Sequence, residues 1–560
     1  MQFIIFGAGE NASKLIGSMV KNGYEIKFLV DNDKEKQGKQ ILGFDVKSPK
    51  ELINFRKGQE YVLISVLNKL VYEEIAAQMV DLGLKRDGDF SHGKYFFSTD
   101  VVQSGKVSGY IDLPEKFSAV KSFDPASHLI KLKKERRIFR LVHSNYAEQY
   151  VRVHEICRDN HLYGSYVIET KIVENIWNLS EALVLEHCFL EPVSYSFEWS
   201  PGMFSDYVSF MLSMLKRFAE CGLALCDGHT LNATITEGRF IFIDFGALKE
   251  GNTSGIVLLE FLNTHIIPLI LIYKNQIAKA YLYLKNPGIE YTITDIQGYL
   301  NEDELSTMQM LYRSLIQINS AEDICRFVEM VSEFIGSMNR NKLTTRWEGY
   351  QNDEWEWSSD PSKWSLKMRN VSEMIERINP DTIVDLAGNM GWYGTYWHKN
   401  LKYALIVDYD YNCIDYLWKK ICINKMSNVV PIYMSVCVPT LDYYRDDAIS
   451  GSAVEPWRKS AVDRFRSEVV IALAIVHHLA FAQQLSFAEI IGQFTLFTSR
   501  YLIVEFIEQN DQYITNFLKN GFEWYTKENF VRELKKNFKI LETRLSTPCE
   551  TRTIYLCELK

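Results

Sequence analysis

The chain has 560 residues, and at roughly 150 residues per domain this length predicts about three to four domains. Hydrophobic residues make up 47% of the chain and charged residues 24%, a composition typical of globular proteins and not of disordered or fibrous ones. Its 62 Lys and Arg against 71 Asp and Glu give a net charge of −9, which argues against nucleic acid as a partner.

The beginning of the chain and its cysteines predict a cytoplasmic protein. Residues 1–5 enter a strand pattern directly, without the basic stretch that opens a secretory signal. No transmembrane segment is expected, because the most apolar stretch, 256–273, is interrupted by Glu260 and Pro268. The 10 cysteines include no Cys-x-x-Cys pair, so neither a zinc site nor a disulfide framework is expected. Peripheral membrane association and homo-oligomerisation stay open.

Two stretches interrupt the pattern and predict domain boundaries. The first, 98–121, is polar and broken by glycines and a proline, and the second, 339–363, is rich in aromatic and polar residues. They divide the chain into three expected domains of plausible size. These span 1–100, 115–345 and 360–560.

The first domain begins with a strand, a glycine turn, a helix and a second strand. Residues 2–6 are apolar, Gly7 and Gly9 follow, and the strand at 25–30 ends at Asp31. This order is typical of half of a dinucleotide or sugar-nucleotide site, where glycines let the backbone approach a phosphate at a helix N-terminus. Gly7, Gly9 and Asp31 are therefore candidate ligand-binding residues. The alternative is a βαβ unit that only packs.

This domain resembles the small Rossmann-like domain of bacterial sugar acyltransferases and other surface-glycan enzymes. The resemblance rests on the segments Phe6 to Gly9, Val30 to Asp33, Gly43 to Val46 and Tyr61 to Val66. The resemblance covers about residues 1–97. It implies a nucleotide-sugar or a related phosphate ligand.

The middle domain is expected to be α+β. Residues 128–133 and 136–143 are typical of a β-hairpin, and 146–158 of a helix. Residues 203–221 carry apolar side chains at helical spacing, which predicts a long helix with one buried face.

A phosphoryl-transfer layout follows that helix. Asp227 stands five residues before Asn232, a predicted hairpin comes next, and Asp244 opens an Asp-Phe-Gly sequence. In such a layout Asp227 orients the acceptor hydroxyl, while Asn232 and Asp244 hold the Mg²⁺ that neutralises the phosphates of ATP. The D-x-H-x-x-N form resembles the aminoglycoside and small-molecule kinases, which implies a kinase-like domain.

Two features argue against kinase activity. No G-x-G-x-x-G loop precedes residue 140, and Arg140 stands where a phosphate-binding lysine is expected. Arginine is not a like-for-like replacement for lysine. Glu148 or Glu155 on the next helix is the expected partner of Arg140. We expect a cleft that binds Mg²⁺ or Mn²⁺ but turns over ATP weakly or not at all. This cleft would hold a phosphorylated or sugar acceptor for the methyltransferase. An active kinase is the alternative.

The last domain has the pattern of a doubly wound sheet. Residues 382–386 form an expected strand that contains Asp385 and runs into a turn with Gly388 and Gly391. The next expected strand ends at Asp408, with Asp410 two residues later. Further strands are expected at 469–473, 501–506, 538–541 and 553–558, the last two as an antiparallel end.

This domain resembles the class I S-adenosylmethionine-dependent methyltransferases, with Ala387 in place of a glycine in their first motif. The resemblance implies that Asp385, Gly388 and Gly391 bind the cofactor, that Asp408, or failing it Asp410, binds its ribose, and that His477 and His478 border the transferred methyl group. The alternatives are another adenosine ligand for the sheet and a merely hydrogen-bonded histidine pair.

A wider resemblance covers about residues 120–560. This part of the chain resembles bacterial methyltransferases with a kinase-like amino-terminal region. The resemblance rests on the segments Tyr146 to Tyr150, Asp227 to Asn232, Phe242 to Asp244 and Val476 to Ala480. We therefore expect a methyltransferase for a sugar or glycan acceptor in bacterial surface polysaccharide biosynthesis. Two alternatives remain, a bifunctional kinase–methyltransferase that modifies glycan ends and a non-catalytic ligand-binding assembly protein.

In the expected methyltransferase a side chain must take the proton of the acceptor. The candidates are His478, His477 and Glu505.

Overall fold

The structure is a computed structural model that describes residues 2–9, 12, 15–16, 19, 25–55, 60–66, 69–84, 90–92, 118–120, 127–132, 135–174, 182–285, 291–340, 344–350, 360–442, 458–512, 514, 521–548 and 550–560. The chain divides into two compact units. Unit 1 comprises Met1–Leu132, Asn175–Ala182 and Tyr444–Trp457, and unit 2 comprises Lys133–Glu174, Leu183–Tyr443 and Arg458–Lys560. Unit 2 thus holds most of the expected kinase-like region and the expected methyltransferase region, and the three domain boundaries stay a prediction.

Unit 1 is built on a sheet with apolar residues on both faces. Its elements are β1 (Gln2–Phe6), β2 (Ile26–Val30), β3 (Gln40–Ile41), β4 (Phe44–Lys47), β5 (Glu60–Ile64), α2 (Lys69–Asp81) and β6 (Phe90–His92). The strand order is β3-β4-β2-β1-β5-β6, and every pair except β3–β4 is parallel. Ile5 packs in one apolar cluster and Ile4 in the other, as expected for a parallel sheet covered on both sides. The expected strand, glycine turn and second strand are confirmed.

The first part of unit 2 is α+β, as the periodicity predicts. Its main elements are β9 (Arg137–His143), α4 (Ser144–Asp159), β10 (Thr170–Val173), β11 (Ala182–His187), α5 (Pro201–Cys221), β13 (Ala233–Thr236), β14 (Arg239–Phe242), α6 (Gly255–Phe261), α7 (Ile267–Tyr273), α8 (Ile277–Lys285), α10 (Glu302–Ser314) and α11 (Ala321–Ser337). The expected hairpin at 233–243 forms, with β13 and β14 antiparallel. Its turn uses Glu237 and Gly238, both with positive φ, which matches the twist of the strands.

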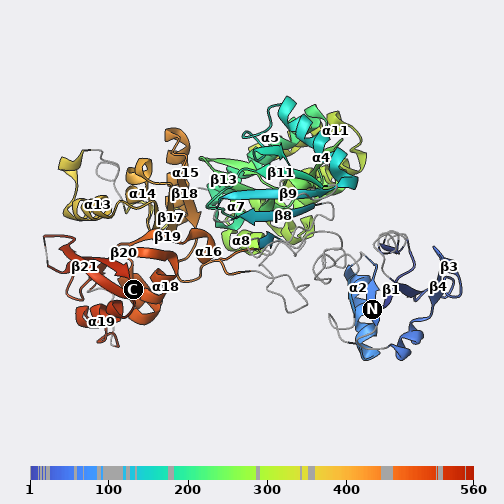
Figure 1. The fold of residues 1–560 in the computed structure, drawn as a ribbon. Coiled ribbons are helices and arrows are strands. Elements are labelled where there is room, and N and C mark those ends of the chain that lie inside the picture. The colour runs from blue at the N-terminus through green and yellow to red at the C-terminus, as the bar shows by residue number, and fades with distance from the viewer. Residues whose placement is uncertain are drawn as a thin grey trace. The chain divides into compact units, whose positions relative to one another are not determined.

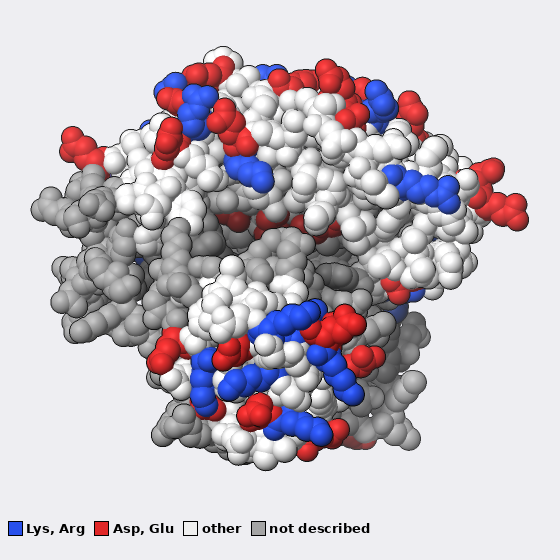
Figure 2. Space-filling view, turned by 90° about the vertical axis from the view of Figure 1, so that its right-hand side faces the viewer, with Lys and Arg blue, Asp and Glu red and all other residues white. Residues whose placement is uncertain are grey.

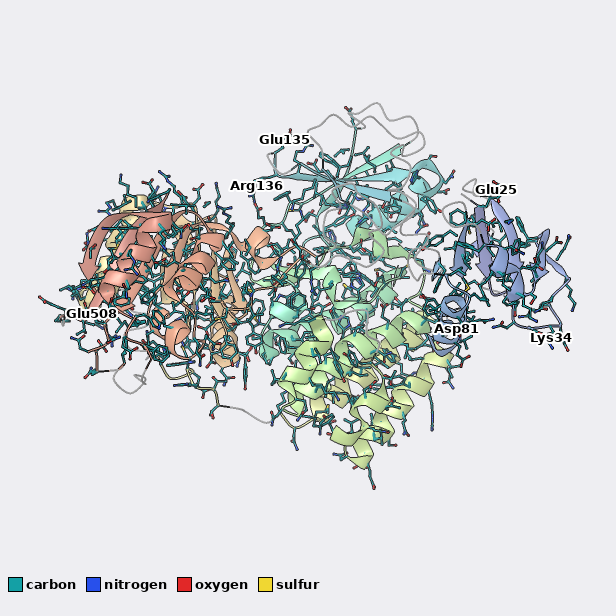
Figure 3. The ribbon with its side chains drawn as sticks, turned by 90° about the horizontal axis from the view of Figure 1, so that it is seen from below. Glu25, Lys34, Asp81, Glu135, Arg136 and Glu508 are labelled. Atoms are coloured by element: carbon teal, nitrogen blue, oxygen red, sulfur yellow. The ribbon has the colours of Figure 1, made fainter. Side chains whose placement is uncertain are left out.

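One helical stretch in the described part of the chain, Gly255–Tyr273, is long and apolar enough to cross a membrane. Most of it is buried inside the fold, and a buried core helix has the same composition as a membrane helix. In the lower part of the view in Figure 2, Lys and Arg side chains are interspersed with Asp and Glu side chains. At the turn before β9, Glu135 and Arg136 project outward (Figure 3), and Arg136 donates to Glu191 at 2.7 Å.

The second part of unit 2 contains a seven-stranded sheet (Figure 1). Five strands are parallel, and the two strands at one edge of the sheet pair antiparallel. The elements are α13 (Leu366–Ile378), β16 (Thr382–Leu386), α14 (Trp392–Trp397), β17 (Tyr403–Asp408), α15 (Tyr411–Asn424), β18 (Val429–Tyr433), α16 (Ala461–Phe465), β19 (Ser467–Ala472), α17 (Val476–Phe481), α18 (Phe487–Phe497), β20 (Thr498–Ile507), α19 (Lys527–Asn537), β21 (Phe538–Leu545) and β22 (Arg552–Leu559).

The order of this sheet is β18-β17-β16-β19-β20-β22-β21, with β22 antiparallel to both neighbours. The order reverses between β16 and β19, so a crevice for ligands is expected at the carboxyl ends of these two strands. The α/β, Rossmann-like fold of this region is as expected, although β18 had not been anticipated from the sequence.

Candidate functional site

The turn after β16 needs glycine at two positions for two different reasons. A Cβ on Gly388 would lie 2.8 Å from Cγ of Asp385 and 2.9 Å from Ile406, so space excludes any side chain. Gly391 has φ +74°, a conformation that glycine adopts without strain. Ala387, which replaces a glycine of the expected motif, adopts φ 58°. The turn therefore holds an alanine in the left-handed region that glycine favours.

Asp385 is a buried carboxyl with one unpaired oxygen. The residue is 3% exposed, and Oδ2 has no hydrogen-bond partner among the described residues. Burial, reinforced by the nearby charge of Asp408, raises the pKa of Asp385 to about 8. This carboxyl therefore carries a proton at neutral pH. A ligand that brings a cationic or hydrogen-bond-donating group would satisfy Oδ2 and favour the carboxylate.

Two further buried polar atoms lie on the same crevice without a partner in the described part of the chain. They are Oδ1 of Asn389, in the glycine turn, and Nδ1 of His477, in the helix that follows β19. Buried polar atoms are normally hydrogen-bonded. Three unpaired ones at the carboxyl ends of β16 and β19 fit a polar ligand in that crevice.

The two acids after β17 have different surroundings. Asp408 accepts the backbone N–H groups of Asn389 at 2.7 Å and of Asp410 at 2.8 Å, and burial raises its pKa to about 6. Asp410 caps helix α15 by accepting from the backbone of Asn412 at 3.1 Å and of Cys413 at 3.3 Å. Asp408 thus faces the glycine turn, whereas Asp410 stabilises a helix end.

The predicted histidine pair lies in α17. The rings of His477 and His478 are 4.0 Å apart. Burial, followed by the neighbouring His478 and Arg552, lowers the pKa of His477 to about 3. Burial and the charge of Arg346 also lower the pKa of His478. Both imidazoles are therefore neutral at pH 7.

Glu505 is placed differently from the histidines. It is 0% exposed, its Oε2 accepts Lys367 Nζ at 3.1 Å and the backbone N–H of Ala474 at 2.8 Å, and its Oε1 accepts the hydroxyl of Ser546. These bonds hold the loop between β19 and α17 in place. Glu505 as the base stays a prediction, but its hydrogen bonds favour a positioning role.

Residues 344–350, which lie in the second predicted domain boundary, also border the site. Trp347 donates its backbone N–H to Asp410 at 2.9 Å and accepts from Asn389 Nδ2 at 3.2 Å. Its indole stands 5.0 Å from the ring of His478, at 67°. In the described part of this stretch, Trp347 and Tyr350 are the aromatic residues that could have indicated its packing from the sequence.

The structure also brings together the residues of the predicted phosphoryl-transfer layout. Ile243 donates its backbone N–H to the carbonyl of Asn232 at 2.8 Å across the hairpin, so Asn232 and Asp244 are neighbours. Asn232 Nδ2 donates to the carbonyl of Asp227 at 3.4 Å. The predicted spacing therefore does gather Asp227, Asn232 and Asp244 around one hairpin.

Arg140 changes the charge of that cluster. It is 2% exposed and donates Nη2 to Oδ1 of Asp244 at 3.0 Å and Nε to His187 at 3.3 Å. Asp244, expected to bind a metal, is thus neutralised by a buried guanidinium. No group of three or more His, Cys, Asp and Glu side chains in the described ranges is placed to hold a metal ion. Glu155, one expected partner of Arg140, pairs with Arg152 at 3.2 Å.

In unit 1 the predicted ligand acid binds the glycine turn itself. Asp31 accepts the backbone N–H of Ala8 at 2.7 Å, and Lys36 lies 3.3 Å from the same carboxylate. Gly7 has φ +101°, and a Cβ there would lie 2.6 Å from Ser65 Oγ, whereas Gly9 has open space around it. A ligand phosphate at this turn would meet the Asp31 carboxylate, which supports the packing-only alternative.

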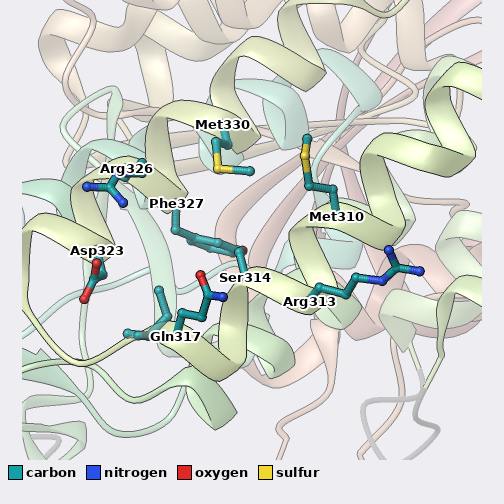
Figure 4. A pocket seen from close by; sticks show the side chains of 9 residues that line it. Met310, Arg313, Ser314, Gln317, Asp323, Arg326, Phe327 and Met330 are labelled. Carbon is teal, nitrogen blue, oxygen red and sulfur yellow. The ribbon is translucent and has the colours of Figure 1, made fainter.

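One described cavity lies away from all these residues. It has a volume of about 300 Å³ and lies between α10 and α11 (Figure 4). Its lining residues are Met310, Arg313, Ser314, Gln317, Ile318, Asp323, Arg326, Phe327 and Met330.

Comparison with known proteins gives partial matches. Residues 1–88 match the family described as C2185-like, N-terminal. The nodulation protein NoeA of Rhizobium meliloti (strain 1021) is 23% identical over 410 residues, which are 68% of this chain and 82% of that protein.

Two solved structures match part of the chain. The magnesium protoporphyrin IX methyltransferase of Synechocystis PCC 6803, with bound S-adenosylmethionine, is 11% identical and matches 34% of this chain and 77% of that one, with a TM-score of 0.25. The N-methyltransferase NodS of Bradyrhizobium japonicum WM9 is 8% identical and matches 34% and 96%, with a TM-score of 0.24.

Proposed function

We propose that the protein is an S-adenosylmethionine-dependent methyltransferase and that the crevice of the seven-stranded sheet is its active site. The observation that carries the proposal is the buried, unpaired Oδ2 of Asp385 behind the Gly388 turn. A carboxyl in this position suits the ammonium group of the cofactor, and Asp408 suits its ribose hydroxyls. Gly388 and Gly391 keep the turn free of side chains that would fill the crevice.

The cofactor supplies a methyl group on a sulfonium, and its transfer to a hydroxyl or amine leaves S-adenosylhomocysteine and one proton. His478 is the residue best suited to take that proton, since it is neutral at pH 7 and only partly buried. His477 is the alternative, but it is more deeply buried. Glu505 would hold the loop that carries both. General-base assistance of this kind contributes about 10²–10⁴-fold to a rate.

The acceptor in this proposal is a sugar or glycan of a bacterial surface polysaccharide, methylated in the cytoplasm. The support is the resemblance of residues 1–97 to surface-glycan enzymes. The kinase-like region would hold the acceptor without consuming ATP, because the Arg140 guanidinium already neutralises Asp244. Mg²⁺ at Asn232 and Asp244, and a bifunctional enzyme that also transfers phosphate, are the less favoured alternatives.

Calorimetry with S-adenosylhomocysteine tests the proposal. The purified full chain should bind it, and Asp385→Asn should weaken binding by about 1–3 kcal/mol, the cost of losing a buried charged hydrogen-bond partner. Asp381→Asn is the matched control, because Asp381 is exposed and pairs only with Lys402 among the described residues. Absence of heat and of any thermal shift with wild type would contradict the proposal, as would equal loss in both variants.

A further inference from the structure

The segment from Thr345 to Tyr350 is fixed to the crevice by the backbone of Trp347, the hydroxyl of Thr345 and the carboxylate of Glu348. Thr345 Oγ1 donates to Oδ1 of Asp410 at 2.5 Å, and the backbone of Trp347 contacts Asp410 and Asn389 as described above. Glu348 accepts from Asn412 Nδ2. The backbone is thus anchored to the loops after β16 and β17, which leaves its side chains to border the space beside α17.

Trp347 and Arg346 border the crevice beside His478. The indole of Trp347 lies 5.0 Å from the His478 ring, and the Arg346 guanidinium lies 5.0 Å from the indole. Arg346 is also close enough to His478 to influence it electrostatically. An aromatic face, a cation and the best-suited base therefore lie together at the mouth of the site.

Among the described residues, no carboxylate pairs with Arg346, unlike the other cations near the histidines. Lys367 pairs with Glu505 at 3.1 Å, and Arg552 pairs with Asp511 at 2.8 Å. Arg346 is exposed, and no carboxylate of the described residues lies within ion-pair distance of it. A free guanidinium forms strong, often paired hydrogen bonds with planar carboxylates and with phosphates.

We propose that Arg346 and Trp347 form an acceptor subsite for a sugar ring that carries an anionic group, either a carboxylate or a phosphate. This inference rests on the proposed function and names its substrate class. The apolar C–H face of the sugar packs on the Trp347 indole, which presents a large flat surface at low entropic cost. The anionic group pairs with Arg346. Together these contacts orient one hydroxyl or amine of the ring toward His478.

The test is calorimetry on the full chain saturated with S-adenosylhomocysteine. The probes are glucuronate for the carboxylate, glucose 1-phosphate for the phosphate and methyl glucoside as the neutral control. At least one anionic sugar should bind, and Arg346→Gln should weaken that binding at least tenfold. Arg340→Gln is the matched control, because Arg340 is an exposed guanidinium 4.8 Å from the ring of Tyr273 and should leave binding unchanged.

Several results would overturn the inference. These are no binding of either anionic sugar by the loaded wild type, equal binding of methyl glucoside, and unchanged binding by Arg346→Gln. Loss of S-adenosylhomocysteine binding in Arg346→Gln would also overturn it, because it would place Arg346 in the cofactor site. Failure of the wild type to bind S-adenosylhomocysteine is a different outcome, which contradicts the proposed function itself.

Discussion

Asp415 on helix α15 caps the beginning of helix α5, although it lies 213 positions from Gly202 in the sequence. It accepts the backbone N–H of Gly202 at 2.8 Å and the hydroxyl of Ser200 at 2.5 Å. Burial raises the pKa of Asp415 to about 6. Helix α15 begins beside Asp410, and α5 leads toward the loop with Asp227. Helix α15, beside the crevice of the seven-stranded sheet, is therefore attached directly to helix α5 in the first part of unit 2.

Gly202→Ala should destabilise unit 2. A Cβ at this position would lie 2.5 Å from Oδ1 of Asp415, so the helix cap must shift, and overpacking of this kind costs about 1–3 kcal/mol. Thermal unfolding should show a lower midpoint. Gly336→Ala on helix α11 is the control, since nothing lies within 4 Å of its Cβ position, and alanine there should be neutral or stabilising. Equal midpoints for both variants would contradict the assigned cap.

Cofactor binding should release a proton from Asp385. The carboxyl has a pKa of about 8 without ligand, so it is mostly protonated at pH 7. A ligand ammonium favours the carboxylate, and affinity should therefore rise as the pH increases toward 8. Calorimetry at pH 7 in buffers with different ionisation enthalpies should show release of about one proton per S-adenosylhomocysteine. Asp385→Asn should abolish the release, and buffer-independent heats in wild type would show that Asp385 is not involved.

Asp244→Ala should lower stability more than Asp227→Ala. Removing Asp244 takes away the carboxylate that the buried Arg140 guanidinium contacts at 3.0 Å, and at this half-exposed pair the loss costs about 1–3 kcal/mol. Asp227 is 41% exposed. Among the described residues, its side chain only accepts the backbone N–H of His229 at 3.2 Å and lies 3.5 Å from the His229 ring. Its loss should therefore cost about 1 kcal/mol or less. Urea unfolding distinguishes the two.

This difference decides which variant can test ATP turnover. Asp227→Ala is the suitable one, because a loss of activity in Asp244→Ala would be mixed with a loss of structure. Robust ATP consumption by wild type that disappears in Asp227→Ala would contradict the docking role and favour the bifunctional enzyme.

Arg346→Gln should raise the pKa of His478. Burial lowers this pKa first, and the positive charge of Arg346 lowers it further, so removing the charge allows protonation at a higher pH. The pH dependence of diethyl pyrocarbonate modification, followed at His478 by mass spectrometry, should shift upward. Arg340→Gln should leave it unchanged, and a downward shift would show that Arg346 does not face His478.

The elements around the candidate site could be predicted from the sequence because their signals are local. The apolar run at 382–386 followed by Gly388 and Gly391 specifies a buried strand and a turn. The spacing from Asp227 to Asn232, with a hairpin after it, places both near Asp244. Such patterns depend on backbone conformation and hydrophobic period within a few residues, which sequence expresses directly.

Only the tertiary structure determines which partner each side chain has. Arg140 and Asp244 are 104 positions apart, and nothing near either residue indicates that the guanidinium, instead of a metal, neutralises the acid. The sequence left Asp408 and Asp410 as alternatives, and only the structure shows that Asp408 bonds the glycine turn whereas Asp410 caps α15. The segment at Trp347 borders the crevice because loops distant in sequence supply its hydrogen-bond partners. Pairings of this kind depend on burial and geometry across the whole fold, which no local pattern encodes.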